Sequence, residues 1–470
     1  MNLILGAGLS GLSCSYHLGH EKCLLLEAGS GPYGHIGSEM RDGYTWDQGP
    51  HVSFTKDDYV RELFAESVGN EYEEYTVRTR NYFQGHWVEH PAQCHLYQIP
   101  EPLRSQCLAD FHSARANTSP ESPANYAEWL HYAFGKTFAE TFPAAYTRKY
   151  WTVEPSQMGT DWIGQRVFFP SAEDIEKGYH GPLDRETHYI TKVRYPTRGG
   201  YQAFAKKMMQ GANIFTGHEV VEVDLAEKKV LVRLIGRSET KTFEYSRLIS
   251  TLPIPEFVKI CKGIPPAAKE AAEELNCSEL LLVNISVPHP TMLEGNWFYI
   301  YDAEFLSTRI NYTERLSPHN APEGSSGIQV EVYAHPKKGF SEEHQKIAKK
   351  VIWECVQMGF VNQQILDQAK DIPISQALTG LRYHTKYCKY ANVICDHSRK
   401  AALDCIFTSL EPFGLCRADA DLHPYTDWTK ENQANSGDLI LAGRFGQWKY
   451  YWTDDCVLRG KAISENAKYS

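Results

Sequence analysis

The feature that most constrains this chain is a turn of the pattern G-x-G-x-x-G directly after an apolar strand at residues 2–5. Gly6, Gly8 and Gly11 occupy the three glycine positions. In a dinucleotide-binding βαβ unit the first glycine allows the tight turn, the second lets the backbone approach a pyrophosphate, and the third lets helix and strand pack closely. The N-terminus of the following helix offers unpaired N–H groups and a positive dipole to the phosphates. The sequence therefore predicts a dinucleotide site at its start.

An acidic residue at the correct offset supports this prediction. A second strand, Cys23 to Leu26, is followed at once by Glu27. An acid in this position accepts hydrogen bonds from an adenosine ribose and prefers a free 2′-hydroxyl, which favours FAD or NAD over NADP. The glycine pattern alone also occurs in ordinary glycine-rich turns, but here the strand, the helix and the acid all agree.

Composition narrows the class of protein. A length of 470 residues exceeds one average domain and indicates two or three modules. With 42% hydrophobic and 23% charged residues, the chain is neither fibrous nor disordered. The net charge of −10 argues against nucleic acid as a partner. The 12 cysteines show no C-x-x-C pair or zinc-ligand spacing, so we expect reduced thiols and no metal site.

The hydropathy pattern bears on location. No apolar run approaches the roughly 18 residues that a membrane-spanning helix needs. The first predicted strand begins at Asn2, which leaves no room for a signal peptide. We therefore expect a cytoplasmic protein without a membrane span.

The pattern of elements changes three times along the chain. Residues from about 55 to 165 are predicted to be mainly helical, and apolar residues recur at helical intervals from Tyr126 to Phe142. After a glycine turn near residue 200, the sequence predicts a helix at 201–209 and strands at 219–223, 230–234 and 247–252. A block of strands near 280–287, 296–301, 307–312 and 327–333 follows, then a helix at 342–358, a strand at 438–442 and a last helix from about 455.

The C-terminal strand helps to choose between cofactors. It ends at the glycine turn of Gly443 and precedes a helix. An extended FAD needs two such contacts that lie far apart in the sequence, whereas the alternative is a simple core strand. We predict an α/β fold with a Rossmann-like FAD-binding domain of the glutathione-reductase type, an inserted helical region and a mixed β-sheet substrate domain. The predicted boundaries are 1–60, 194–275 and 396–470 for the FAD-binding domain, 61–193 for the mainly helical substrate or lid region, and 276–395 for the β-sheet domain.

Further motifs make a family resemblance specific. In order and spacing they resemble the FAD-dependent amine oxidase and protoporphyrinogen oxidase superfamily, and within it most of all the UDP-galactopyranose mutases, especially the eukaryotic form. The segments that carry the resemblance are 47–52, 84–88, Trp151 with Pro155, 161–167, 194–200, 248–251 and 443–450.

The resemblance implies a flavin-dependent nucleotide-sugar mutase that interconverts pyranose and furanose rings. In that family, N5 of reduced FAD acts as a nucleophile at the anomeric carbon. The implied partners are a nucleotide-sugar substrate and, as a candidate reductant, NAD(P)H.

The resemblance also implies the residues of the site. Arg166 and Arg309 match the arginines that bind the diphosphate, and Tyr390 and Tyr450 match tyrosines that point at the same phosphates. His51 matches a histidine whose backbone lies near flavin N5, and Gln93 matches a ligand of uracil. Aromatic or sugar-contacting positions are matched by Trp151, Trp297 and Tyr299. The expected cofactor-binding residues are Gly6, Gly8, Ser10, Gly11, Glu27, Ala28, Gly34, Ser38, Gly49, Pro50, His51, Val220, Gly443, Arg444, Asp454 and Asp455.

Several positions depart from the family pattern. His90 replaces an aromatic residue that helps to sandwich uracil, Thr147 and Ile190 replace asparagines, and Pro50 and His35 replace glycines of the flavin loops. These changes suggest a different nucleotide sugar or a changed reaction.

Two alternatives remain open. One is an FAD-dependent oxidoreductase of the amine oxidase or protoporphyrinogen oxidase type, in which Arg166 and Arg309 are incidental or bind a carboxylate. The other is a flavoprotein that serves only as a binding module.

Overall fold

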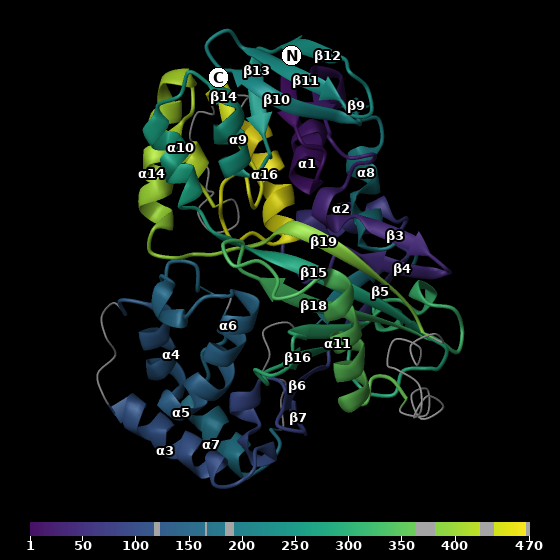
Figure 1. The fold of residues 1–470 in the computed structure, drawn as a ribbon, viewed down its shortest axis with the longest axis vertical. Helices are drawn as coiled ribbons and strands as arrows, with labels where there is room; N and C mark the ends of the chain where they lie inside the picture. The colour runs from purple at the N-terminus through teal and green to yellow at the C-terminus, as the bar shows by residue number, and fades with distance from the viewer. Residues whose placement is uncertain (117–122, 165–166, 184–191, 363–380, 424–436, 467–470) are drawn as a thin grey trace.

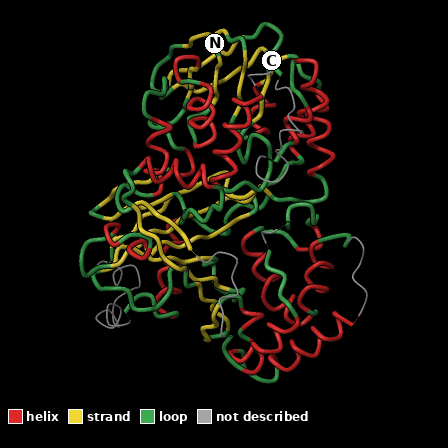
Figure 2. Tube along the Cα trace, turned by 180° about the vertical axis from the view of Figure 1, so that it is seen from behind, coloured by secondary structure: helices red, strands yellow, loops and turns green. Residues whose placement is uncertain are grey.

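The computed structural model describes residues 1–116, 123–164, 167–183, 192–362, 381–423 and 437–466. Figure 1 shows an α/β part that contains both chain ends, a broad β-sheet below it, and a group of helices at the opposite end. Seen from behind, that last group is almost entirely helical, whereas the strands gather in the other two parts (Figure 2). This arrangement agrees with the predicted fold class.

A five-stranded parallel sheet forms the centre of the α/β part. Its order is β20-β13-β1-β2-β9, so strands from both ends and the middle of the chain lie side by side. The strands are β1 (Asn2–Leu5), β2 (Cys23–Leu26), β9 (Ile214–Phe215), β13 (Arg247–Ser250) and β20 (Leu439–Leu441). All five are nearly continuous apolar runs, as expected for parallel strands that are covered on both faces.

Two helices from opposite ends of the chain pack together beside this sheet. They are α1 (Leu9–Leu18) and α16 (Thr453–Asn466). The hydroxyl of Ser13 donates a hydrogen bond to the Val457 carbonyl at 2.7 Å, and Ser464 donates to the His17 carbonyl at the same distance. The turn before α1 is tight: Gly6 has φ +96°, and a Cβ on Gly11 would lie 2.1 Å from the Gly6 carbonyl oxygen.

A smaller sheet completes the α/β part. Its order is β12-β11-β10-β14, with β10 (His218–Asp224), β11 (Lys229–Leu234), β12 (Thr240–Glu244) and β14 (Cys261–Lys262). The helices of this part are α8 (Lys206–Met209), α9 (Ile254–Ile260), α10 (Pro266–Glu273), α14 (Arg399–Leu410) and α15 (Arg417–Asp421). Helix α2 (Asp58–Ser67) and the two-stranded sheets β3–β4 (Ser38–Arg41, Tyr44–Asp47) and β5–β8 (Tyr72–Thr76, Lys192–Pro196) connect it to the rest.

The second large sheet has seven strands in the order β19-β15-β18-β17-β16-β6-β7. They are β6 (Thr79–Phe83), β7 (His86–Glu89), β15 (Cys277–Val287), β16 (Trp297–Ile300), β17 (Arg309–Tyr312), β18 (Ser326–Ala334) and β19 (Arg382–Val393). Helix α11 (His344–Gln357) packs on it through Ile347, Val351 and Ile352. Strands β6 and β7 fall in a range predicted to be mainly helical, and β6 is held there by parallel pairing with the distant β16.

The helical part contains α3 (Leu103–Ala116), α4 (Tyr126–Phe134), α5 (Lys136–Ala139), a π-helical turn (Glu140–Ala144), α6 (Ala145–Tyr150) and α7 (Ala172–His180). The prediction of one helix from Tyr126 to Phe142 is wrong. The helix is broken at Gly135, which has φ +77° and lies against α3 so closely that a Cβ would be 2.5 Å from the Phe111 nitrogen. Apolar residues keep their helical spacing across the break because Leu130 and Phe134 before it, and Phe138 and Phe142 after it, are all buried.

Burial governs the chemistry of the thiols. All twelve cysteines are free, and nine of them are buried. Burial raises the pKa of Cys14, Cys107, Cys261 and Cys277 to about 12. In the part of the chain that the structure describes, no helix is long and apolar enough to cross a membrane.

The glycine turn gives a direct test of the fold. In a Gly11→Ala variant the added methyl group meets the Gly6 carbonyl, and we expect a loss of about 1–3 kcal/mol of stability and weaker flavin retention. Thermal unfolding and the flavin absorbance of the purified protein measure both effects. Gly31→Ala is the matched control, since a Cβ there meets nothing within 4 Å. An unaffected Gly11→Ala protein would contradict this account of the turn.

Candidate active site

The glycine turn and Glu27 form one end of the candidate site. Glu27 accepts hydrogen bonds from the backbone N–H groups of Ala7 at 2.9 Å and Gly29 at 2.7 Å, so its carboxylate lies beside the turn. A carboxylate has further lone pairs, which remain for the hydroxyl groups of a ribose. A Cβ on Gly8 would meet only Gly34, at 3.8 Å, so the backbone there is open to a close ligand. These residues fit the adenosine diphosphate end of a dinucleotide.

Neighbouring predicted residues lie at the same end. Ala28 is exposed directly after Glu27. Strand β10, which carries Val220, begins beside Glu27, because the N–H of His218 donates to the Glu27 carbonyl at 2.9 Å.

The C-terminal segment returns to this end of the sheet. A Cβ on Gly443 would lie 2.7 Å from the Ser10 hydroxyl, so the turn after β20 touches the start of α1. Arg444 donates twice to the Tyr451 carbonyl, at 2.8 and 2.6 Å. Asp455, in the first turn of α16, accepts from the Trp452 N–H at 2.7 Å. Burial and the neighbouring Asp455 raise the pKa of Asp454 to about 6.

The loop around residue 50 continues the site. Ser38 donates to the Asp47 carboxylate at 2.6 Å, and this buried acid also accepts from the Tyr195 hydroxyl at 2.9 Å. His51 approaches the Gly49 carbonyl through Nδ1 at 2.8 Å. Burial, together with the charge of Arg444, lowers the pKa of His51 to about 3. The imidazole is therefore neutral near pH 7, with its proton on Nδ1, because the Gly49 carbonyl can only accept.

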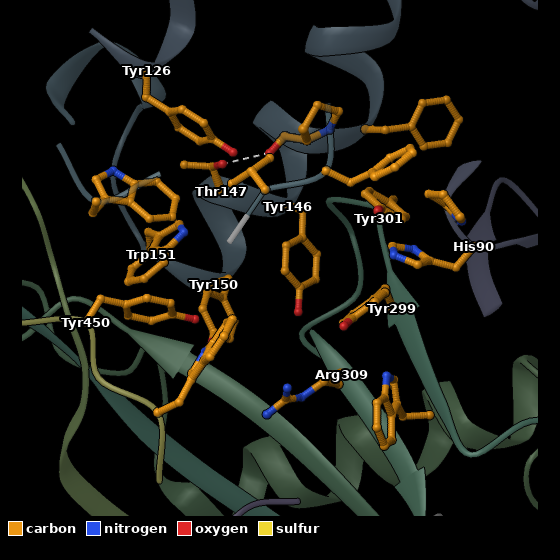
Figure 3. Close-up of a pocket in the computed structure, with 18 of the residues that line it drawn as sticks. His90, Tyr126, Tyr146, Thr147, Tyr150, Trp151, Tyr299, Tyr301, Arg309 and Tyr450 are labelled. Atoms are coloured by element: carbon orange, nitrogen blue, oxygen red, sulfur yellow. Dashed lines mark hydrogen bonds between the residues drawn. The ribbon is translucent and has the colours of Figure 1, made fainter. Parts of the chain in front are cut away.

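A cavity of about 360 Å³ lies between this loop, the helical part and the seven-stranded sheet. Figure 3 shows its aromatic walls, with Arg309 extending into it from β17. The structure brings together six predicted substrate and phosphate residues at this cavity: Gln93, Trp151, Trp297, Tyr299, Arg309 and Tyr450. Pro50, His51 and Arg444 line it as well.

Other predicted residues are not at the cavity. Tyr390 does not line it; its hydroxyl donates to Glu256 at 2.7 Å, and its ring packs against Phe445 with centroids 5.5 Å apart. Tyr390 lies away from the cavity because it stands on β19 at a position that faces α9, which carries Glu256. His35 contacts the Tyr390 carbonyl through Nε2 at 2.7 Å. Arg166 and Ile190 lie outside the described residues.

Arg309 is held by an acid that the sequence analysis did not identify. Its Nε and Nη2 donate to the two oxygens of Glu331, each at 2.7 Å, and Tyr333 donates to the same carboxylate at 3.0 Å. Glu331 is buried. Burial opposes the charge of Arg309, but the Glu331 carboxylate outweighs it and holds the pKa of Arg309 well above its ordinary value. A signal was present: Glu331 is the one charge in the apolar segment 327–334, and a buried charge requires a partner.

Two tyrosines of α6 were also missed. Tyr146 contacts the rings of Tyr299 and Tyr301, with centroids 5.1 and 5.6 Å apart, and its hydroxyl has no hydrogen-bond partner among the described residues. Tyr150 donates to the Asn392 amide oxygen at 3.1 Å. Burial raises the pKa of both phenols well above the ordinary value, so both are neutral donors. Their spacing of four residues places both on one face of a helix.

Three of the positions that depart from the family pattern, Pro50, His90 and Thr147, lie at the cavity. Thr147 lines it, but its hydroxyl donates to the Pro143 carbonyl at 2.7 Å, in the π-helical turn that leads into α6 (Figure 3). His90 contacts the buried Asn81 amide oxygen through Nδ1 at 3.1 Å, and its ring lies 5.2 Å from that of Tyr299. The cavity thus offers aromatic faces, neutral hydroxyl donors and a guanidinium held at a fixed position.

Comparison with solved structures shows the same fold in several proteins. A crystal structure of reduced UDP-galactopyranose mutase superposes with a TM-score of 0.83 at 21% identity and covers 100% of this chain and 96% of that one. A putative protoporphyrinogen oxidase from Exiguobacterium sp. 255-15 gives 0.70 at 15% identity, with 100% and 98% covered. A putrescine oxidase bound to putrescine gives 0.60 at 13% identity, with 100% and 99% covered.

The sequence also matches a family model. The model described as flavin containing amine oxidoreductase matches residues 9–366, well over half of the chain. Together with the glycine turn, the acid after β2 and the returning C-terminal strand, this match shows that the chain is a member of the flavin-containing amine oxidoreductase family and an FAD-dependent enzyme of that superfamily.

Proposed function

We propose that the protein is a flavin-dependent nucleotide-sugar mutase, which interconverts pyranose and furanose rings and requires its FAD to be reduced. The observation that carries this proposal is the placement of Arg309, which extends into an aromatic cavity that the loop of His51 also lines. The similarity in fold to reduced UDP-galactopyranose mutase supports it.

The residues that would hold FAD are those around the glycine turn, Glu27, the loop of residues 49–51, and Gly443 to Asp455. When bound and reduced, FAD supplies an electron-rich nitrogen that can attack an anomeric carbon. His51 remains neutral on this loop, so its side chain adds no positive charge beside the ring.

The protein must hold the diphosphate while the sugar rearranges. Arg309 uses two of its five N–H groups on Glu331, which leaves three for phosphate oxygens. The hydroxyls of Tyr146 and Tyr299 point toward Arg309 in Figure 3 and can donate to the same oxygens. Fixed donors in a site with little water stabilise a departing anion better than mobile ones. His90 and Thr147, which replace family residues at the cavity, favour a nucleotide sugar other than UDP-galactose.

A second candidate is an oxidoreductase of the amine oxidase or protoporphyrinogen oxidase type. It is favoured by one observation, the neutralisation of Arg309 by Glu331 inside a largely aromatic cavity, which also suits a substrate of low charge. The requirement for a reductant separates the two candidates, because an oxidoreductase must turn over from the oxidised flavin.

The first test is a screen of UDP-, dTDP- and GDP-sugars with the purified yellow protein, before and after reduction with dithionite. We expect ring interconversion of at least one sugar, detected by chromatography, only after reduction. Substrate oxidation by the oxidised protein, with consumption of oxygen, would overturn the mutase proposal in favour of the oxidoreductase.

Arg309 can be tested without leaving its buried partner, Glu331, as an unpaired charge. Removing Arg309 alone leaves Glu331 unpaired, which costs about 3–5 kcal/mol and confounds the result. We therefore expect an Arg309→Met/Glu331→Gln protein to retain flavin but to lose turnover by a factor of roughly 100 or more. Glu331→Gln alone, whose amide oxygen still accepts from Arg309, is the control, and we expect it to keep a larger share of the turnover than the double variant. Full turnover in the double variant would remove Arg309 from the site.

The depressed pKa of His51 predicts a change in acid stability. In the unfolded chain the imidazole binds a proton below about pH 6.5, whereas in the folded protein it does so only near pH 3. This histidine therefore destabilises the fold progressively as the pH falls from about 6.5 toward 3. A His51→Asn variant, which can still donate to Gly49, should lose less stability between pH 7 and pH 4 in denaturant titrations. An unchanged slope would show that His51 titrates normally.

A further inference from the structure

The two walls of the cavity belong to different parts of the fold. One wall is α6 and the residue after it, with Tyr146, Tyr150 and Trp151. The other is the hairpin of β16 and β17, with Tyr299 and Arg309. The contacts that a ligand can make with both walls depend on the distance from α6 to the hairpin. A contact between α6 and the hairpin would fix this distance.

Lys149 lies on α6 and reaches the loop of the hairpin. Its Nζ donates to the carbonyls of Asp302 at 2.9 Å and Ser307 at 2.7 Å, which lie at opposite ends of the connection between β16 and β17. Burial lowers the pKa of Lys149 to about 8, although Glu354 and Asp302 oppose the shift. Protonated or neutral, the amine has enough N–H groups for both carbonyls.

The same loop is held from two other elements. Glu354 of α11 accepts from the N–H of Leu306 at 2.7 Å and from the N–H and hydroxyl of Ser307 at 2.9 and 2.5 Å. Asp302 accepts from the Gln84 N–H at 2.9 Å with each of its oxygens. Asp302, Ser307 and Glu354 are all buried. The loop is therefore rigid, and Lys149 ties α6 to a fixed point.

We propose that Lys149 is a positioning residue that sets the separation between the tyrosines of α6 and Arg309, and so determines how a substrate fits the cavity. Arg309 follows Ser307 by only two residues, and Tyr146 and Tyr150 flank Lys149 on its own helix. A shift of about 1 Å at such a site can change turnover on the order of 100-fold. The effect on substrate binding rests on the proposed mutase function, whereas the effect on the separation of the walls does not.

The experiment compares amide hydrogen exchange in the FAD-bound Lys149→Met, Glu354→Gln and wild-type proteins. If Lys149 ties the two walls, Lys149→Met accelerates exchange in residues 145–151 as well as in residues 301–308. Glu354→Gln loosens only residues 301–308, since Glu354 has no bond to α6 among those described. Lys350→Met, a change at an exposed lysine of α11, serves as the control for a lysine-to-methionine substitution.

The KM for the substrate gives a second measurement, which would stay unchanged if Lys149 only supported the fold. With the nucleotide sugar that the wild type converts, we expect Lys149→Met to raise KM on the order of tenfold, with flavin content unchanged and Lys350→Met unaffected. Lys149→Arg, which keeps donors for both carbonyls, should recover part of the loss. If the wild type converts no sugar, the proposed function fails, and the exchange pattern alone decides the role of Lys149.

Two results would overturn the proposal. The first is unchanged exchange in residues 145–151 of Lys149→Met. The second is the same exchange pattern in Lys149→Met and Glu354→Gln, which would mean that Lys149 only helps the loop to fold. Should Lys149→Met fail to fold, Lys149→Gln retains an amide NH2 group that can donate, and the same comparison decides the question with that variant.

Discussion

The parallel pairing of β1 with β13, and of β13 with β20, is the constraint on which the rest of the molecule depends. These three strands come from the beginning, middle and end of the chain. The chain leaves this sheet for two long segments, one between β2 and β9 and one between β13 and β20, and each time it returns beside the strand it left. The helical part and the seven-stranded sheet are formed by the segments between these strands. They meet at the cavity, which the loop of His51 also lines.

The sequence predicted the elements whose signals are local. The strand, turn and helix at Gly6 to Gly11, the helix α11 and the strand before Gly443 all follow from periodicity and glycine spacing. Strands β6 and β7 could not be predicted in this way, because their short polar and aromatic segments are held by pairing with β16, far along the chain. The break at Gly135 depends on contact with Phe111, which no local pattern encodes.

The residues of the candidate site were predicted from family-like positions more than from physical pattern. Gln93, Trp151, Trp297, Tyr299, Arg309 and Tyr450 meet at one cavity, whereas Tyr390 pairs with Glu256. Glu331 and Lys149 were not identified from the sequence. The role of Glu331 follows from the register of β17 on β18, which pairs it with Arg309, and that of Lys149 follows from its contacts with the loop 301–308. A buried ion pair such as Arg309 with Glu331 adds little net stability, since desolvation of both charges offsets their attraction. What it provides is a guanidinium held in one orientation.

The deep burial of the thiols has a consequence for how the protein tolerates changes in redox conditions. A thiol reacts with peroxides and disulfides through its thiolate, and Cys14, Cys107, Cys261 and Cys277, with a pKa of about 12, hold almost none near neutral pH. No cysteine is among the residues that line the cavity within the described chain. These four buried thiols are therefore protected from disulfide formation and from oxidation to sulfenic acid when the protein meets an oxidant.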